Sequence, residues 1–283
     1  MEVTGSRKKI GNVELGGKTC AVCISITGKN REEILKQALD LRTKGADLAE
    51  WRVDHYLNSL LTGNGKGAAL SEGSFDTLCT SVSEILPDLK TALGKVPLIF
   101  TFRTKGEGGV CELPLEGYEK LCRMAALSGC ADALDVEYVI WREWSESKRG
   151  ETEFLKSKVS GNLCLMLSNH DFQKTPSEEE LLKRLTQMEK LGADIAKIAV
   201  MPERAEDVLT LLHASLKAKA KLQIPVITIS MGQLGTVSRL AGTVFGSCLT
   251  FASTGDGSAP GQIPVELVKD LFVKYARNGQ ERQ

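Results

Sequence analysis

Short apolar runs alternate with longer amphipathic segments along most of the chain. Eight runs rich in Val, Ile, Leu and Phe predict strands at residues 19–26, 48–54, 96–103, 133–138, 162–170, 195–201, 224–231 and 245–253. Between them, apolar positions recur at helical spacing, for example at residues 31–43, 178–191 and 205–221. Strands that are apolar on both faces are typical of a parallel sheet covered by helices. Eight strand–helix repeats therefore predict a single-domain α/β fold, the (β/α)₈ TIM barrel.

Local signals support this assignment. Gly45, Gly129 and Gly192 each follow a helical segment and precede a strand, as glycines that end helices do. The rival fold is an open, doubly wound sheet. Its glycine-rich phosphate turn is absent after the first predicted strand, where the sequence is SITGKN.

Three segments fall outside the repeat. Residues 1–17 form a polar leader and residues 279–283 a short tail, so the barrel is expected over residues 18–278. Residues 61–74 (LTGNGKGAALSEGS) are a Gly-rich insertion. Its Gly-Lys pair is followed by Gly rather than by Ser or Thr, so we expect a surface loop and no phosphate loop.

Composition and charge exclude several protein classes. The 283 residues include 36 Lys and Arg against 36 Asp and Glu, which argues against a nucleic-acid-binding protein. No apolar run approaches the ~18–20 residues of a membrane-spanning helix, and no secretory signal is present, so a cytoplasmic protein without a membrane partner is expected. The eight cysteines are expected to be reduced thiols. Cys20 and Cys23 would point to opposite faces of a strand, so we expect neither a disulfide nor a shared metal there.

Ionisable residues lie inside the predicted strands. Glu50, Arg52 and Asp54 alternate along the second strand and so would share the face that points into the barrel. Arg103 closes the third strand, Asp135 lies in the fourth and His170 ends the fifth. Buried charges are costly unless they are paired or functional, and active sites of barrels form at the C-terminal ends of the strands. The set therefore predicts an active site.

Each of these residues also has a structural interpretation. Glu50 and Arg52 could form an ion pair across the barrel floor, His170 could cap the following segment, and Asp135 could hold a neighbouring strand.

Lys197 is the candidate nucleophile. It is flanked by Ile195, Ala196, Ile198 and Ala199 in the sixth strand, so it cannot reach water as a surface lysine does. Desolvation and nearby arginines favour the neutral amine, which attacks ketones to form an imine. The alternative is a salt bridge from Lys197 to Glu50 or Asp135. In the imine-forming interpretation, His170 supplies the proton transfers.

Six stretches resemble one family in the right order: AEWRVDHY (49–56), FTFRTKGEGG (100–109), SNHDFQKTPS (168–177), KIAVMP (197–202), SRLAGTVFGS (238–247) and SAPGQIP (258–264). Together they resemble the signatures of type I 3-dehydroquinate dehydratase. The resemblance implies loss of water from 3-dehydroquinate to give 3-dehydroshikimate, a step of the shikimate pathway of aromatic amino acid biosynthesis. It implies no metal and no organic cofactor.

The resemblance also assigns roles to residues of this chain. Lys197 corresponds to the lysine that forms the Schiff base, His170 to the acid–base group and Glu107 to the glutamate that orients that histidine. Asp135 corresponds to an acid behind them. The groups corresponding to substrate contacts are Glu50, Arg52, Arg103, Arg239, Ser258, Gln262 and Ser25. A homodimer is usual in the family, and the end of the chain at residue 283 leaves no room for a fused second enzyme. We therefore expect a monofunctional homodimer.

Two alternatives stay open at this stage. A class I aldolase would share the lysine of the sixth strand, but would turn over phosphorylated sugars. A non-catalytic barrel that binds small acids or a protein would form no adduct at Lys197. The sequence does not separate a biosynthetic role from quinate breakdown.

Overall fold

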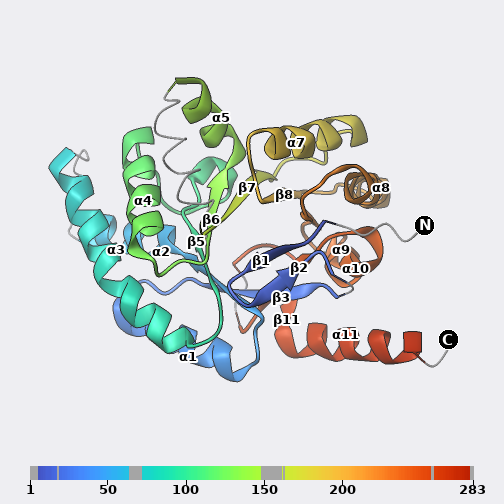
Figure 1. Cartoon of the computed structure of the whole chain (residues 1–283), viewed down its shortest axis with the longest axis horizontal. Helices are drawn as coiled ribbons and strands as arrows, with labels where there is room; N and C mark the ends of the chain where they lie inside the picture. Colours follow the sequence, from blue (N-terminus) through green and yellow to red (C-terminus); the bar gives the residue numbers. More distant parts are fainter. Residues whose placement is uncertain are drawn as a thin grey trace.

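A ring of parallel strands forms the centre of the molecule (Figure 1). The computed structural model describes residues 6–17, 19–63, 72–147, 161, 163–255 and 258–280. Neighbouring strands pair in chain order, and the ring is completed where Cys248 N donates to Val226 O at 2.9 Å. The strands are β3 (Ala21–Ile26), β4 (Leu48–Arg52), β5 (Leu98–Thr101), β6 (Ala133–Glu137), β7 (Cys164–Asp171), β8 (Ile195–Val200), β9 (Val226–Ser230), β10 (Leu249–Ser253) and a short β11 (Ile263–Pro264) beside β10.

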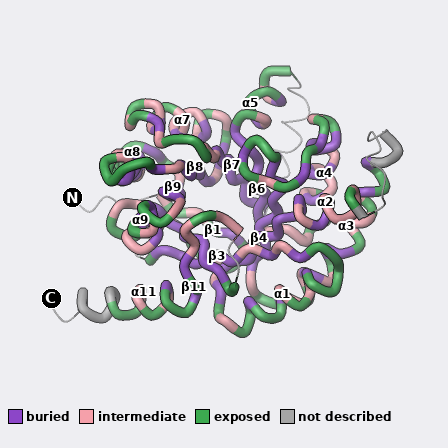
Figure 2. The backbone as a smooth tube through the Cα atoms, turned by 180° about the vertical axis from the view of Figure 1, so that it is seen from behind, coloured by how far each residue is buried: buried purple, intermediate pink, exposed green. Residues whose placement is uncertain are grey.

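Helices surround the ring, with their exposed sides facing outward and the strands buried (Figure 2). The predicted TIM barrel is confirmed, and each predicted strand is found within a few residues of its expected bounds. Gly45, Gly129 and Gly192 have φ values of +70°, +67° and +87°, as expected for glycines that end helices. The helices are α1 (Arg31–Thr43), α2 (Val53–Gly63), α3 (Glu72–Leu93), α4 (Leu115–Ser128), α5 (Tyr138–Ser147), α7 (Glu178–Lys190), α8 (Ala205–Lys221), α9 (Thr236–Leu240), α10 (Gly242–Phe245), α11 (Val265–Gln280) and a 3₁₀ turn, η1 (Lys105–Glu107).

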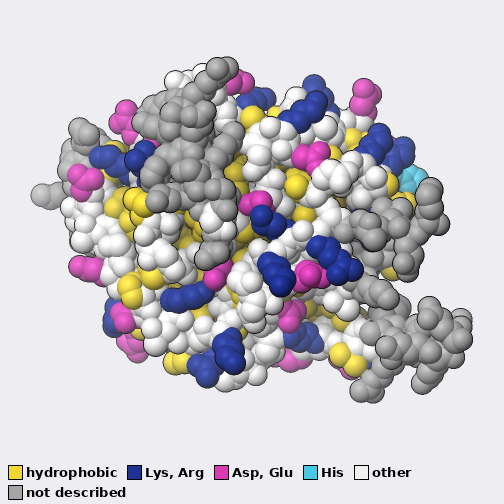
Figure 3. All heavy atoms as spheres, in the orientation of Figure 1, with side chains coloured by type: hydrophobic (Ala, Val, Ile, Leu, Met, Phe, Trp, Pro, Cys, Tyr) yellow, Lys and Arg dark blue, Asp and Glu magenta, His cyan; other side chains and the backbone are white. Residues whose placement is uncertain are grey.

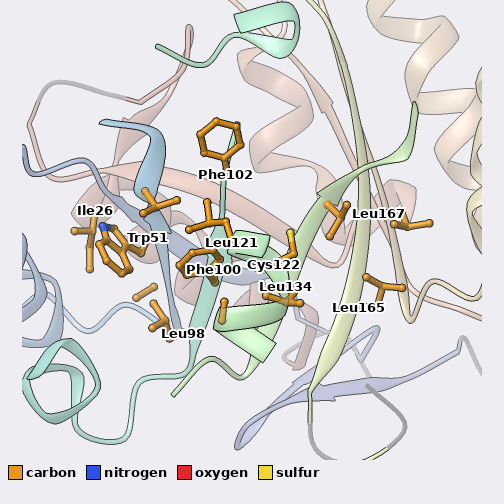
Figure 4. Packing of buried hydrophobic residues seen from close by; sticks show 14 of the residues in the cluster. Ile26, Trp51, Leu98, Phe100, Phe102, Leu121, Cys122, Leu134, Leu165 and Leu167 are labelled. Atoms are coloured by element: carbon orange, nitrogen blue, oxygen red, sulfur yellow. The ribbon is translucent and has the colours of Figure 1, made fainter. Parts of the chain in front are cut away.

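The larger core lies between the strands and the helices. Large side chains on the outward faces of β4 to β7, such as Trp51, Phe100 and Leu134, pack against residues of α4 such as Leu121 (Figure 4). The rings of Trp51 and Phe100 meet edge to face with centroids 5.8 Å apart. This shell leaves the inward faces of the same strands free to carry other chemistry.

The inside of the barrel is divided into two levels. Toward the N-terminal ends of the strands it is apolar. Leu48, Ile99 and Ile195 belong there to a second hydrophobic core. Toward the C-terminal ends many inward positions are charged or polar. This division separates the part of the barrel that stabilises the fold from the part that forms the site.

A β-hairpin closes the apolar end of the barrel. Strands β1 (Lys8–Ile10) and β2 (Val13–Leu15) pair antiparallel within the stretch expected to be a polar leader. Ile10 and Leu15 are fully buried in the inner core, while most other side chains of the hairpin are partly or fully exposed. In Figure 1 the hairpin lies across the middle of the ring. The hairpin therefore contributes Ile10 and Leu15 to the inner core of the barrel.

The predicted Gly-rich insertion lies between helices α2 and α3. Residues 61–63 of the predicted insertion end α2 and residues 72–74 begin α3, and residues 64–71 lie outside the described part of the chain. Among the described residues, no helix is long and apolar enough to cross a membrane. On the face seen in Figure 3, Lys and Arg side chains lie interspersed with Asp and Glu side chains.

Candidate active site

A pocket with about 480 Å³ of empty space opens at the C-terminal ends of the strands. The predicted site residues converge there from seven different segments of the chain. Apolar side chains of Phe172, Ile229, Met231 and Phe251 complete the wall. The predicted residues that line the pocket are Glu50, Arg52, Arg103, Glu107, His170, Lys197, Arg239, Ser258 and Gln262.

Lys197 projects from the middle of β8 and is only 4% exposed. Its Nζ donates to Asp135 Oδ2 at 2.9 Å and lies 3.7 Å from Glu50 Oε1. The same nitrogen is 4.4 Å from the centroid of the Phe251 ring. Both carboxylates that were considered as partners thus lie near the amine, and an aromatic ring faces it as well.

Glu50 links Lys197 to the loop at the mouth of the pocket. Ser25 Oγ donates to Glu50 Oε2 at 2.6 Å, and Ser258 Oγ donates to Ser25 Oγ at 2.9 Å. Gln262 in turn donates to Ser258 Oγ at 3.0 Å and accepts from Ser258 N at 2.9 Å. Ser25 does not line the pocket itself, but it connects two residues that do.

The position of Asp54 differs from the one expected from the sequence. Strand β4 ends at Arg52 and α2 begins at Val53, so Asp54 is a helical residue and does not continue the alternation of the strand. Arg52 nevertheless forms a two-pronged ion pair with Asp54, at 2.8 and 2.9 Å. The ion pair of Glu50 with Arg52, considered as the structural alternative, is not formed, since Glu50 faces Lys197 instead. The buried Arg52 guanidinium lowers the pKa of Asp54 against the effect of burial.

Arg103 is surrounded by acids. Its guanidinium donates to Asp135 at 2.7 Å and to Glu137 at 3.4 Å, and it lies 3.6 Å from Glu107. Burial alone would raise the pKa of Asp135, but Arg103 and Lys197 overcome it and hold that pKa well below its usual range. Asp135 therefore stays ionised beneath the pocket, where it contacts both cations.

His170 and Glu107 form a close pair. His170 Nδ1 lies 2.8 Å from Glu107 Oε2, and the backbone N–H of His170 donates to the same oxygen at 3.0 Å. Burial raises the pKa of Glu107 to about 8, while Arg103 opposes that rise. Burial, together with Arg103 and Lys197, lowers the pKa of His170. Near neutral pH the two groups therefore titrate as a unit.

The consequence for His170 depends on one proton. When the pair holds it, Glu107 is a carboxylic acid hydrogen-bonded to Nδ1 and the other ring nitrogen, Nε2, carries hydrogen. When the pair loses it, the hydrogen on Nε2 leaves, the acid proton of Glu107 moves to Nδ1, and Nε2 presents a lone pair beside ionised Glu107. The second state is a general base, and the first can act as an acid.

The turn that carries Glu107 depends on two glycines. Gly108 has φ +86°, and a Cβ there would lie 2.2 Å from the ring of Phe172. A Cβ at Gly109 would lie 1.9 Å from the carbonyl oxygen of Arg103. Only glycine fits these positions, so the GEGG segment can fold back and place Glu107 beside His170.

Arg239, on the short helix α9, differs from the other cations. It is 2% exposed, yet among the described residues no carboxylate lies within 4 Å of its guanidinium. Its Nη2 donates to Pro260 O at 2.9 Å and its Nη1 to Phe251 O at 3.4 Å, while its Nε has no partner among the residues that the structure describes. Burial lowers its pKa to about 10, so it remains a cation. A buried, unpaired guanidinium that lines a pocket is suited to a ligand carboxylate.

Sequence reasoning missed three polar residues that support the site. Ser168 donates to Asp135 and accepts from Arg103 at 2.9 Å. Asn169 donates to Glu107 Oε1 at 3.0 Å. Glu137, the last residue of β6, accepts from Thr104 N at 2.8 Å. Asn169 directly precedes His170 and Ser168 lies two residues before it, and uncharged polar residues at the end of an apolar strand were the available signal.

Residues 22–276 match the family described as type I 3-dehydroquinase. The chain is 42% identical over 261 residues to the 3-dehydroquinate dehydratase of Lactiplantibacillus plantarum, which covers 92% of this chain and 94% of the relative. It is 40% identical over 252 residues to the Klebsiella pneumoniae protein of the same name, with 89% and 91% covered. The crystal structure of 3-dehydroquinate dehydratase from Geobacillus kaustophilus is similar with a TM-score of 0.84 at 33% identity, over 98% of this chain and 99% of the other.

Proposed function

The chain belongs to the type I 3-dehydroquinase family and is a 3-dehydroquinate dehydratase, a hydro-lyase, and we propose that it acts through a Schiff base on Lys197. The observation that carries this mechanism is one pocket that holds a buried primary amine beside a histidine–glutamate pair. It requires no metal and no organic cofactor.

The first step is attack of the Lys197 amine on the substrate ketone, with loss of water to form the imine. Asp135 accepts a hydrogen bond from Nζ and Glu50 lies nearby, so both carboxylates favour the protonated, cationic imine once it forms. The ring of Phe251 faces the same nitrogen and adds a cation–π contact. The ion pairs of Lys197 and its nucleophilic role are thus compatible.

The second step is loss of the proton from the carbon next to the imine. His170 with a free Nε2 removes it, and the protonated imine takes up the electron pair to give a neutral enamine. The pairing of Ser168 with Lys197 places His170 two residues, roughly 7 Å along the strand, nearer the mouth than Lys197. The enamine then expels the C1 hydroxyl, which takes a proton from His170, and water releases the product and restores Lys197.

The remaining residues bind the substrate. Arg239 binds its carboxylate, since this guanidinium has no carboxylate partner in the described part of the chain. Glu50, Arg52, Arg103, Ser258 and Gln262 contact its hydroxyls, and the last two belong to a loop at the mouth of the pocket. Ser25 supports this set through its hydrogen bonds to Glu50 and Ser258. Glu107 orients His170, while Asp135 holds Lys197 and Arg103.

The substrate is tested by offering the protein 3-dehydroquinate beside a panel of phosphorylated sugars. Formation of the conjugated product from 3-dehydroquinate alone supports the proposal, and exclusive cleavage of a phosphorylated sugar would favour an aldolase instead. We further propose that residues 18–278, with the hairpin of residues 8–15 closing the barrel, form one catalytic domain that acts in the shikimate pathway. Assembly as a cytoplasmic homodimer remains a prediction, which sedimentation of the purified protein tests.

A further inference from the structure

The two oxygens of Glu107 face different groups. Oε2 faces His170, through both the backbone N–H at 3.0 Å and Nδ1 at 2.8 Å. Oε1 accepts from the side-chain amide of Asn169 at 3.0 Å. Asn169 is 8% exposed. It directly precedes His170 on β7, so the two side chains leave the strand on opposite faces. It has no place in the mechanism described so far.

Arg184 fixes the direction of the Asn169 amide. Its Nη1 donates to Asn169 Oδ1 at 2.9 Å, and its Nε donates to Glu180 on the same helix, α7, at 2.8 Å. A guanidinium can only donate, so the amide must present its oxygen to Arg184 and its NH₂ group to Glu107. The amide therefore always reaches Glu107 as a donor.

A donor at Oε1 selects the state of the pair. A hydrogen bond to a carboxylate stabilises the ionised form, and ionised Glu107 accepts the hydrogen on His170 Nδ1. The lone pair of the imidazole then lies on Nε2, the nitrogen that acts as base. Asn169 is also one of the groups that oppose the burial of Glu107 and lower its pKa.

We propose that Asn169 and Arg184 are positioning residues that hold Glu107 as an acceptor and thereby fix the basic tautomer of His170. The inference rests on the proposed function, in which His170 is the base. The other charged groups that face the pair are unchanged in the variants below. They are Arg103 at the end of β5, Asp135 and Glu137 on β6, Lys197 on β8 and Arg52 on β4.

The test compares pH profiles of kcat for Asn169→Leu and Arg184→Met. In Asn169→Leu the acidic limb should move upward by about one pH unit or more, a roughly tenfold loss below it, with KM changed little. Arg184→Met should shift the limb in the same direction by less, and Arg184→Lys should restore it. Lys183→Met is the matched control, since Lys183 lies on the same helix and pairs only weakly with Glu180 at 3.8 Å.

A second readout is independent of turnover. In protein labelled with ¹⁵N-histidine, the ring shifts of His170, assigned with His170→Ala, should report hydrogen on Nδ1 in the wild type once the pH exceeds the Glu107 pKa of about 8. They should report the protonated pair up to higher pH in Asn169→Leu. Unshifted profiles and ring signals in both Asn169→Leu and Arg184→Met, or an equal loss at every pH, would overturn the inference. Arg184 is partly exposed, so that variant is expected to fold.

Failure of this inference is separable from failure of the proposed function. If the wild-type protein forms a borohydride-reducible adduct on Lys197 while the two variants titrate like the wild type, only the positioning role is wrong. If the wild type forms no adduct, the proposed mechanism itself fails.

Discussion

Replacement of Arg239 by Met separates binding of the substrate from stability of the fold. The guanidinium is buried and has no carboxylate partner among the described residues, so its net favourable ion pair is formed only with substrate. Two charge-assisted hydrogen bonds to a carboxylate contribute about 3–4 kcal/mol, which corresponds to a loss of roughly 10²–10³-fold in kcat/KM. Arg239→Lys keeps the charge but not the planar fork, and should fall between.

The stability of the free protein should depend much less on Arg239 than on Arg103. Arg239→Met removes two hydrogen bonds to Phe251 O and Pro260 O but also a desolvated cation, so the unfolding free energy should change by only about 1 kcal/mol. Arg103→Met leaves Glu137 without its cation and Asp135 with Lys197 alone, at about 3–5 kcal/mol. Steady-state kinetics and thermal unfolding measure the two effects.

Either of two results would refute this reasoning. One is a kcat/KM of Arg239→Met within about threefold of the wild type, which would mean that the substrate carboxylate binds elsewhere. The other is a fall in Tm for Arg239→Met as large as that for Arg103→Met, which would mean that Arg239 stabilises the fold.

Three further predictions concern pH and backbone. Because burial raises the pKa of Glu107 to about 8, the pair with His170 loses its proton only as pH rises, so kcat/KM should increase up to about pH 8 and then level off; a flat profile between pH 6 and 8 would contradict this. The pKa of Asp135 is depressed in the fold, so its contribution to stability is present above pH ~4 and declines as pH falls below that value. Acid unfolding should therefore begin at higher pH in Asp135→Asn. An unchanged midpoint of acid unfolding would count against this prediction. In Gly109→Ala the new Cβ meets a backbone carbonyl, so thermal unfolding should show about 1–3 kcal/mol of lost stability together with lower kcat, whereas wild-type values of both would disprove the close approach.

Much of the fold could be predicted because the strands are apolar on both faces and the helices are amphipathic. The N-terminal hairpin could not be predicted in this way. Its buried side chains, Ile10 and Leu15, lie in a short stretch that is otherwise mostly polar. Their burial depends on the open end of the barrel, which exists only in three dimensions.

The site was predictable for a related reason. Charges such as Lys197 and Glu50 are conspicuous inside apolar strands, and the barrel brings the ends of those strands together. The Asn169–Arg184 pair gave no such signal, because an amide in a strand and an arginine on an amphipathic helix are ordinary residues. The bond between them is set by how α7 packs, and no spacing in the sequence encodes it.

The central claim is imine formation at Lys197. It is tested most directly by intact mass spectrometry after incubation with 3-dehydroquinate and borohydride, with Lys197→Met as the control. The account predicts a stable mass increase of one reduced substrate or product in the wild type and none in Lys197→Met. Wild-type protein that turns over 3-dehydroquinate without a trapped adduct, or a Lys197→Met variant that still acquires one, would contradict it.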